Sequence, residues 1–266
     1  MSFSISGKTA IITGAANGIG LAIGRHFADK GANVVFADMD ESRLVKELGE
    51  NEDGSNIRYF AGDLRQKLAQ ANLLSATIDA FETVDILVNA SRQVVPSEAL
   101  NPDDDAVEML LQQNLMTALR MSQQVARRMI KQSEGQREGS AGTIVNLSSI
   151  AARRTHPDLM AYSISSAALD QMTRSMAVAL APHRIRVNAV AFGSVMSASL
   201  KETLREHTDY REDIECHTPL GRIASATELA EAVQYLACDG SGFMTGQVMT
   251  VDGGRTLLDP CAAPAH

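Results

Sequence analysis

Residues 14–20, Gly-Ala-Ala-Asn-Gly-Ile-Gly, join an apolar run to a helical pattern, and this junction limits the folds open to the chain. The run at 9–13 lacks period-2 alternation, which is typical of a strand buried on both faces. Glycines at such a junction permit a tight turn and the close approach of a ligand. The following helix N-terminus offers N–H groups and partial positive charge to a pyrophosphate. Two interpretations stay open: a nucleotide site, or a tight turn without a ligand.

Apolar runs alternate with helical patterns along the rest of the chain. Further runs lie at 33–37, 57–61, 85–88, 143–147, 185–190 and 248–251, and helical patterns cover about 65–81, 104–131, 162–182 and 227–238. This alternation predicts an α/β fold with a doubly wound parallel sheet. Residues 196–218 are the least regular long segment, and we expect either a lid over a pocket or a surface excursion there.

The composition fits one large domain with a sizeable core, since 45% of the 266 residues are apolar and 21% are charged. A net charge of −8 argues against a nucleic-acid partner. Cys216, Cys238 and Cys261 are far apart and lack metal spacing, which fits free thiols in a reducing cytoplasm, and no His/Cys cluster suggests a metal. The chain start has no signal-like apolar region and no run spans a membrane, so we expect a cytoplasmic protein.

Asp38 follows the second apolar run and lies eighteen residues after Gly20. An acid in this window accepts hydrogen bonds from an adenosine ribose, and its charge repels a 2′-phosphate. Met39 follows it, and the glycine turn contains no Lys or Arg, so the sequence favours NAD over NADP. The alternative is that Asp38 caps the next helix, although Asp40 and Ser42 are better placed for capping.

Two more polar residues have two interpretations each. Asp63 follows the run at 57–61, where it either meets an adenine amino group or caps the helix at about 65–81. Asn114 lies on the apolar face of the helix at about 104–131. A buried amide without partners costs roughly 1–3 kcal/mol, so Asn114 needs a hydrogen-bonding task, either in a site or simply as a satisfied core residue.

Tyr162 and Ser166 lie four residues apart at the start of the helical pattern at about 162–182, so their hydroxyl groups should share one face. The serine pair Ser148-Ser149 ends the preceding apolar run. A serine and a tyrosine on adjoining elements are able to hold one carbonyl or alcohol oxygen between them. A tyrosine that moves protons near neutral pH needs a cation beside it, however, and Ser166 supplies none.

Together these residues resemble the short-chain dehydrogenase/reductase family along essentially the whole chain to about Gly254. The residues that carry the resemblance are Thr13, Gly14, Gly18, Gly20, Asp63, Asn89, Ala90, Asn114, Ser149 and Tyr162, with Val-Asn-Ala-Val at 187–190, Pro-Leu-Gly-Arg at 219–222, Thr-Gly-Gln at 245–247 and Val-Asp-Gly-Gly at 251–254. The family implies one Rossmann-type domain at 1–254, a seven-stranded parallel sheet in three α/β/α layers, a substrate lid at about 194–218 and a tail at 255–266. It also implies a homotetramer or homodimer.

The resemblance implies hydride transfer between NAD(P) and a small-molecule alcohol/carbonyl pair, with no metal, nucleic acid or membrane involved. Carried over to this chain, Tyr162 is the general acid/base, Ser149 holds the substrate oxygen, and Asn114 supports a water-linked proton path. The residues expected at the cofactor, NAD, are Gly14, Asn17, Gly18, Ile19, Gly20, Asp38, Asp63, Leu64, Asn89, Ala90, Ser91, Tyr162, Gly193, Val195 and Ser197. Steroid, sugar, polyol and acyl substrates all stay open.

The chain departs from the family pattern at four positions near the cofactor. Ser166 stands at the lysine of Tyr-x-x-x-Lys, Ser91 at a glycine, Phe192 at a proline and Ser197 at a threonine. The family's lysine holds the nicotinamide ribose and lowers the tyrosine pKa. A free phenol has a pKa near 10, and lowering it to about 7 takes roughly 4 kcal/mol of electrostatic help.

Two hypotheses follow from Ser166. The first is an NAD-dependent oxidoreductase in which another cation replaces the lysine, with Arg153, Arg154 and His156 as the loop candidates. The second is a catalytically impaired NAD-binding homologue with a regulatory or structural role.

Overall fold

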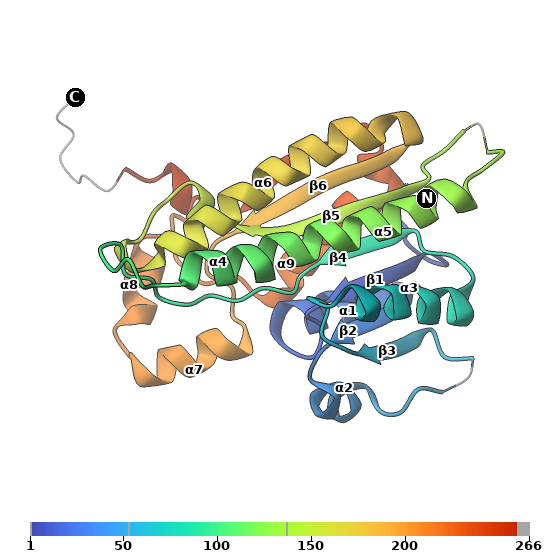
Figure 1. Ribbon diagram of the computed structural model, residues 1–266. Helices are drawn as coiled ribbons and strands as arrows, with labels where there is room; N and C mark the ends of the chain where they lie inside the picture. The colour runs from blue at the N-terminus through green and yellow to red at the C-terminus, as the bar shows by residue number, and fades with distance from the viewer. Residues whose placement is uncertain (1, 53, 137, 260–266) are drawn as a thin grey trace.

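A parallel sheet of seven strands forms the middle layer of the computed structural model, which describes residues 2–52, 54–136 and 138–259 (Figure 1). The strands are β1 (Thr9–Thr13), β2 (Asn33–Asp38), β3 (Ile57–Ala61), β4 (Ile86–Asn89), β5 (Gly142–Ser149), β6 (Ile185–Phe192) and β7 (Val248–Val251). Their order is β3-β2-β1-β4-β5-β6-β7, and every neighbouring pair is parallel. The predicted α/β fold is therefore confirmed.

Helices cover both faces of this sheet and enclose two hydrophobic cores. The helices of one layer are α1 (Gly18–Asp29), α2 (Glu41–Leu48) and α9 (Ala226–Ala237), and those of the other are α3 (Lys67–Phe81), α5 (Thr117–Gln132) and α6 (Met160–Leu180). Ala10 and Ile12 of β1 belong to the first core, whereas Ile11 belongs to the second. Because both faces are covered, the strand is buried at every position and shows no alternation.

The helix predicted at about 104–131 contains a wider turn. The structure has α4 (Ala106–Leu110), a π-helical segment η1 (Leu111–Met116) and then α5. Apolar spacing over six residues does not separate a π turn from an α turn, so the sequence predicted one regular helix. Such turns occur frequently at functional sites, and this one carries Asn114.

The expectation of irregular structure at 196–218 is wrong. This segment forms α7 (Ala198–Glu206) and α8 (Tyr210–Cys216), which lie beyond the edge of the sheet where β5 and β6 end (Figure 1). Ser197 caps α7 by accepting a hydrogen bond from the Leu200 N–H at 3.2 Å. The described residues of α8 are half-buried or exposed, so no apolar face marks this helix in the sequence. A lid function for the segment stays a prediction.

Short helical turns complete the described chain. They are η2 (Ile150–Ala152), η3 (Pro157–Leu159), η4 (Ala181–His183), η5 (Asp239–Ser241) and η6 (Arg255–Leu257). Of the tail predicted at 255–266, residues 260–266 lie outside the described residues. Within the ranges that the structure describes, none of the helices combines the length and the apolar character needed to cross a bilayer.

The carboxyl ends of the strands bring the predicted site residues to one edge of the sheet. The chain runs outward from β1 through β2 to β3 and then returns to place β4 on the other side of β1. Loops that leave β1 and β4 therefore diverge and open a crevice, which is where ligands bind in open α/β sheets. At this edge lie Gly14, Asp38, Ala90, Ser149 and Phe192, each at or just after the end of its strand.

A charged capping box fixes the start of α9. The Ser225 hydroxyl accepts from the Glu228 N–H at 3.3 Å, and the Glu228 carboxylate accepts from the Ser225 N–H at 2.8 Å. Arg222 donates to both Glu228 oxygens, at 2.9 and 2.7 Å. These bonds, that of Arg222 first and that of the Ser225 backbone second, lower the pKa of Glu228 to about 2.

We predict that Glu228→Gln destabilises the protein near neutral pH and not in acid. The lowered pKa stabilises the folded state above the unfolded value of about 4.5, and this contribution is lost as the pH falls from there toward 2. The glutamine keeps the cap, and the ion pair is largely exposed, so the loss at pH 7 should be about 0.5–1 kcal/mol. Urea unfolding at several pH values measures it, with Glu231→Gln on the same helix as the control. An equal loss at every pH would contradict this assignment.

Candidate functional site

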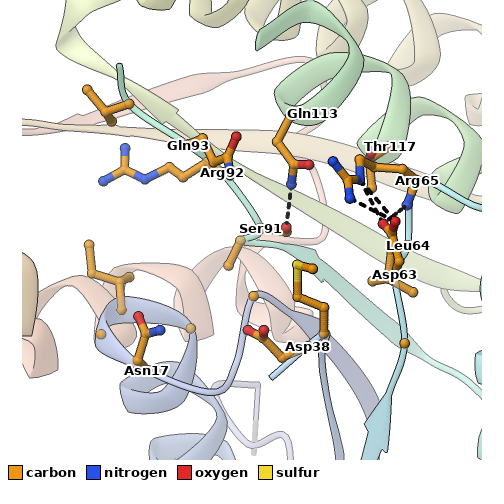
Figure 2. Close-up of a pocket in the computed structure, with 18 of the residues that line it drawn as sticks. Asn17, Asp38, Asp63, Leu64, Arg65, Ser91, Arg92, Gln93, Gln113 and Thr117 are labelled. Carbon is orange, nitrogen blue, oxygen red and sulfur yellow. Dashed lines mark hydrogen bonds and ion pairs between the residues drawn. The ribbon is translucent and has the colours of Figure 1, made fainter. Parts of the chain in front are cut away.

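A cavity of about 480 Å³ opens where the loops after β1 and β4 diverge (Figure 2). This volume lies within the range of small-molecule and cofactor sites. Its lining includes most of the residues expected at a cofactor, namely Gly14, Asn17, Gly18, Ile19, Gly20, Asp38, Asp63, Leu64, Ala90, Ser91 and Ser197. The other lining residues, which were not predicted to contact the cofactor, are Met39, Gly62, Arg65, Arg92, Gln93, Val94, Gln113 and Thr117.

The glycine turn forms part of this cavity because two glycines allow very close backbone contacts. Gly14 has φ +64°, and a Cβ there would lie 2.6 Å from the Ser91 Cα. A Cβ on Gly20 would lie 2.2 Å from the Gly14 carbonyl oxygen. Asn17, the N-cap of α1, makes no side-chain capping bond to a described residue. The first N–H groups of a long helix therefore face the cavity, an arrangement that suits a phosphate group.

Asp38 holds the turn from the end of β2. Its carboxylate accepts from the Ala16 N–H at 3.0 Å and from the Asp40 N–H at 3.1 Å. The N-cap of α2 is Asp40, which accepts from the Arg43 N–H at 3.0 Å. The alternative that Asp38 caps this helix is therefore wrong. Its carboxylate lies on the cavity wall, as Figure 2 shows.

Asp63 also lies on the cavity wall, paired with Arg65. The Arg65 guanidinium donates to both carboxylate oxygens, at 2.9 and 3.1 Å from Nε, and at 2.9 Å from Nη2 (Figure 2). This pairing is the main reason that the pKa of Asp63 is lowered. Because α3 begins at Lys67 with Gln66 as its N-cap, the alternative that Asp63 caps this helix is wrong.

Asn89 was expected at the cofactor, but its side chain points into the protein. Its amide donates to the Ser122 hydroxyl at 3.0 Å and to the Asn146 amide oxygen at 2.8 Å. Asn146 in turn donates to Thr173 at 2.9 Å. These fully buried bonds connect β4 with β5, α5 and α6, so Asn89 stabilises the strand ends that support the site.

Asn114 fixes the loop after β4. Its amide oxygen accepts from the Gln93 N–H at 2.8 Å, and its nitrogen donates to the Gln93 carbonyl at 2.9 Å and to the Ser165 hydroxyl at 3.3 Å. Both interpretations drawn from the sequence therefore apply to Asn114. It is a buried amide with its hydrogen bonds satisfied, and its partners lie on the loop after β4 and on α6, which form the site.

Tyr162, Ser149 and Ser166 lie next to this cavity on α6 and β5. All three side chains are buried, with Tyr162 only 6% exposed. Tyr162 and Ser166 line a small second cavity of about 10 Å³, as expected for two residues on one face of a helix. Ser149 ends β5, and its hydroxyl oxygen accepts from the Ala151 N–H at 3.1 Å.

The cation at Tyr162 is Arg92, which was not among the candidates drawn from the sequence. Arg92 Nη1 donates to the Tyr162 hydroxyl oxygen at 2.5 Å. The three loop candidates have other partners: Arg153 donates to Thr250, Arg154 donates to the carbonyl of Thr256, and His156 accepts from the Asp158 N–H. The only signal for Arg92 in the sequence was its place in the loop that follows Asn89 and Ala90.

Two further residues expected at the cofactor lie beyond the walls of the main cavity. The Gly193 N–H donates to the Val251 carbonyl at 3.2 Å, and Val195 forms a parallel bridge with Ala224. Both residues lie in the connection from β6 toward α7, which the first contact holds against β7 and the second against the segment before α9. A contact of these residues with a cofactor stays a prediction.

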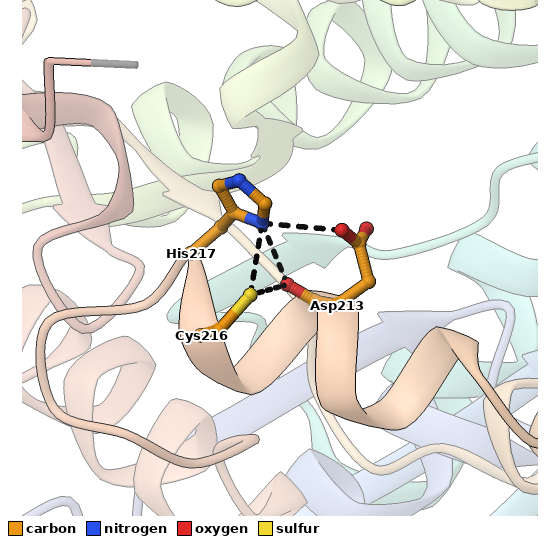
Figure 3. A group of neighbouring side chains, drawn as sticks. All are labelled: Asp213, Cys216 and His217. Carbon is orange, nitrogen blue, oxygen red and sulfur yellow. Dashed lines mark hydrogen bonds and ion pairs between the residues drawn. The ribbon is translucent and has the colours of Figure 1, made fainter. Parts of the chain in front are cut away.

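One cluster of ligand-type side chains occurs away from the site, at the end of α8. Asp213, Cys216 and His217 are exposed, and one potential ligand atom from each lies within 4.8 Å of the other two (Figure 3). The sequence did not suggest this cluster. The His217 ring contacts the Asp213 carbonyl and carboxylate, at 2.9 and 3.2 Å. These bonds explain the cluster as a helix C-terminus in which a histidine meets the terminal carbonyls.

Known proteins are similar to this chain along almost its whole length. The family profile described as Enoyl-(Acyl carrier protein) reductase matches residues 14–256. An uncharacterized oxidoreductase of Thermotoga maritima is 31% identical over 264 residues, which cover 96% of this chain and 100% of that protein. L-rhamnose 1-dehydrogenase (NAD(P)(+)) of Sphingomonas sp. strain SKA58 is 32% identical over 255 residues, with 94% and 96% covered.

A solved structure is similar over almost the same length. The complex of 7 alpha-hydroxysteroid dehydrogenase with NADH and 7-oxo glycochenodeoxycholic acid has 29% sequence identity and a TM-score of 0.86, covering 95% of this chain and 96% of that chain. The chain therefore belongs to the short-chain dehydrogenase/reductase family, as its motifs suggested. An L-rhamnose 1-dehydrogenase, a glucose 1-dehydrogenase and a 3-oxoacyl-[acyl-carrier-protein] reductase are among its relatives, so the chain belongs to a family of oxidoreductases.

We predict that Gly14→Ala destabilises the protein by about 2–4 kcal/mol, because it adds a clash with the Ser91 backbone to the strain of a positive φ. Gly7→Ala is the matched control. Gly7 has φ +76° but no described atom within 4 Å of an added Cβ, so only the strain of roughly 1–2 kcal/mol should appear. Urea unfolding of both variants measures the difference. Equal losses would show that the backbone contact at Gly14 is not close.

Proposed function

We propose that this protein is an NAD(H)-dependent oxidoreductase that interconverts a small-molecule alcohol and the corresponding ketone or aldehyde. The observation that carries the proposal is the position of the Tyr162 hydroxyl, buried on α6 and bonded to a cation that lines the main cavity. A nicotinamide cofactor, when bound, supplies or accepts the hydride. The protein's own task is then to hold the reacting oxygen and to move one proton.

Tyr162 is the group that moves this proton. Arg92 donates to its oxygen, which leaves the phenolic hydrogen free to be donated to a substrate oxygen during reduction. During oxidation, the same oxygen accepts the proton from the alcohol. Ser149 helps to hold the substrate oxygen. Because its own oxygen accepts from the Ala151 N–H, its hydroxyl hydrogen is free to donate.

The glycine turn and Asp38 fit the two ends of the adenosine diphosphate part of the cofactor. The uncapped N-terminus of α1 offers N–H groups and positive potential for the pyrophosphate. The Asp38 carboxylate keeps lone pairs for ribose hydroxyls while it accepts two backbone bonds. These features support a cofactor in the main cavity.

The charges of the cavity wall favour NAD over NADP. Asp38 lines the cavity and is paired with no cation among the described residues, whereas the charge of Asp63 is balanced by Arg65. A 2′-phosphate next to Asp38 would therefore meet a like charge. The known relatives do not decide this point, since the L-rhamnose dehydrogenase is described with NAD(P)(+).

We predict that Tyr162→Phe lowers turnover by roughly 100-fold or more, because it removes the proton donor. A panel of sugars, polyols, steroids and acyl carbonyl compounds, assayed with NADH or NAD⁺, measures the change. Tyr235→Phe is the matched control, since its hydroxyl contacts Met244 and is absent from the described walls of the main cavity. If the native protein is no faster than Tyr162→Phe on every substrate, it is not an oxidoreductase of this kind.

We predict that the double change Asp38→Ala with Met39→Arg shifts the binding ratio of NADPH to NADH by roughly tenfold or more. The change replaces a repelling carboxylate with an attracting guanidinium beside the ribose, and about 1.4 kcal/mol corresponds to a tenfold change in affinity. Calorimetric titration measures both affinities. Asp40→Ala, which removes the neighbouring helix cap, should lower stability without changing the ratio. Tighter binding of NADPH by the native protein would contradict the assignment of Asp38.

A further inference from the structure

We propose that Arg92 supplies the positive charge that Ser166 does not provide, and that it thereby sets the ionisation of Tyr162 for proton transfer. Arg92 is a positioning residue in this proposal, because it acts through Tyr162. The proposal rests on the proton-transfer role given to Tyr162 under the proposed function. It concerns a cation from the loop after β4, whereas the sequence motif places the expected cation on α6.

The contact between Arg92 and Tyr162 is short and partly buried. Nη1 donates to the hydroxyl oxygen at 2.5 Å, and the centre of the guanidinium lies 6.0 Å from the centre of the Tyr162 ring. Tyr162 is only 6% exposed and Arg92 is half-buried, so water reaches this contact mainly from the side of Arg92. A guanidinium that donates to this oxygen stabilises the negative charge that develops on it as the proton is transferred.

Phe192 holds the guanidinium in this place. The Arg92 guanidinium lies 4.2 Å from the centre of the Phe192 ring, within the range of a cation–π contact. Phe192 is 3% exposed, and the strand register places it opposite Ser149. The Phe192 ring, which contacts the Arg92 guanidinium, therefore lies beside Ser149, the serine expected to hold the substrate oxygen. The family pattern has a proline at position 192, so the phenylalanine adds a partner for the cation.

The backbone on both sides of Arg92 is fixed as well. The Ala90 and Ser91 N–H groups donate to the Thr13 hydroxyl at 3.0 and 3.1 Å. On the other side, Gln93 exchanges two hydrogen bonds with the Asn114 amide, at 2.8 and 2.9 Å. Arg92 therefore extends from a short loop that is anchored at both ends, which preorganises its side chain.

Ser166 has a small, uncharged side chain, which leaves space beside Tyr162 for the Arg92 guanidinium. Ser166, Tyr162 and Arg92 line the same small cavity, whose volume of about 10 Å³ is at the lower limit of what one water molecule needs. A lysine at 166 would bring a second positive charge into this space, and like charges in a small buried volume repel. Because Ser166 is uncharged, Arg92 is the one cation beside Tyr162 in this small cavity among the described residues.

The other charged groups around Tyr162 have partners of their own. Arg153, after η2, donates to Thr250. Asp170, further along α6, accepts from the Ser148 hydroxyl at 2.5 Å, and burial raises its pKa. Asp252, after β7, accepts from the N–H groups of Gly254 and Thr256. Arg92 is therefore the cation among the described residues that contacts the phenol directly.

The first test removes and replaces the charge. Arg92→Gln should lower kcat at neutral pH by roughly tenfold or more and raise the pH of half-maximal turnover by about one unit or more, whereas Arg92→Lys should restore most of both. Adding Ser166→Lys to Arg92→Gln should recover at least about tenfold, because the charge returns from α6. Arg153→Gln, which removes a neighbouring cation, is the control and should keep the native pH profile.

A second test does not depend on turnover. Ultraviolet difference titration follows tyrosinate formation, and since the chain has four tyrosines, subtracting the Tyr162→Phe signal isolates Tyr162. The tyrosinate of Tyr162 should form at lower pH in the native protein than in Arg92→Gln, by about one unit or more. If both proteins titrate alike, or if Arg153→Gln shifts the titration as much, the proposal is overturned. If the shift is present but no substrate turns over, the charge assignment stands and the proposed oxidoreductase function fails.

Discussion

A contact between two loops supports the rest of the site. Gly14, after β1, lies so close to Ser91, after β4, that any side chain there would overlap the backbone, and the Thr13 hydroxyl accepts hydrogen bonds from both Ala90 and Ser91. These bonds fix the two loops at the point where the strand order reverses. Both loops line the main cavity, and the arginine at Tyr162 extends from the loop after β4. The cofactor turn and the proton-transfer group are thereby placed by the same few backbone atoms.

The sequence predicted the sheet well because burial on both faces leaves a local signal. Each of the seven strands coincides with an apolar run, within one or two residues at its ends. Helix α8 was missed because its described residues bury little apolar surface and leave no hydrophobic face to detect, and the described side chains of α7 are likewise only half-buried or exposed. The π turn at Leu111–Met116 was missed because its spacing differs from that of an α-helix by only one residue in one turn.

The site was predictable where a residue acts through its own local motif. The glycine turn and Asp38 lie on the cavity wall as predicted, since both follow directly from strand ends. Side chains that depend on distant partners were not predictable. Asn89 turns inward because Asn146 and Ser122 accept its hydrogen bonds, and Arg92 reaches Tyr162 across 70 positions of the sequence. Ser166 lies on α6 and Arg92 lies on the loop after β4, so no fixed sequence spacing relates them. Only the three-dimensional structure shows that they lie at the same tyrosine.

The π turn that carries Asn114 makes the site sensitive to chain length. An α-helix rotates by roughly 100° and rises about 1.5 Å for each residue. Deleting one residue within Leu111–Met116 would convert the wide turn to an α turn and rotate one flank of the helix by that angle relative to the other. Either Asn114 would lose Gln93, or Met121 and Val125 would leave the core. An alignment with a relative that lacks this turn therefore needs a one-residue gap here, and a gapless alignment would match the wrong residue to Asn114.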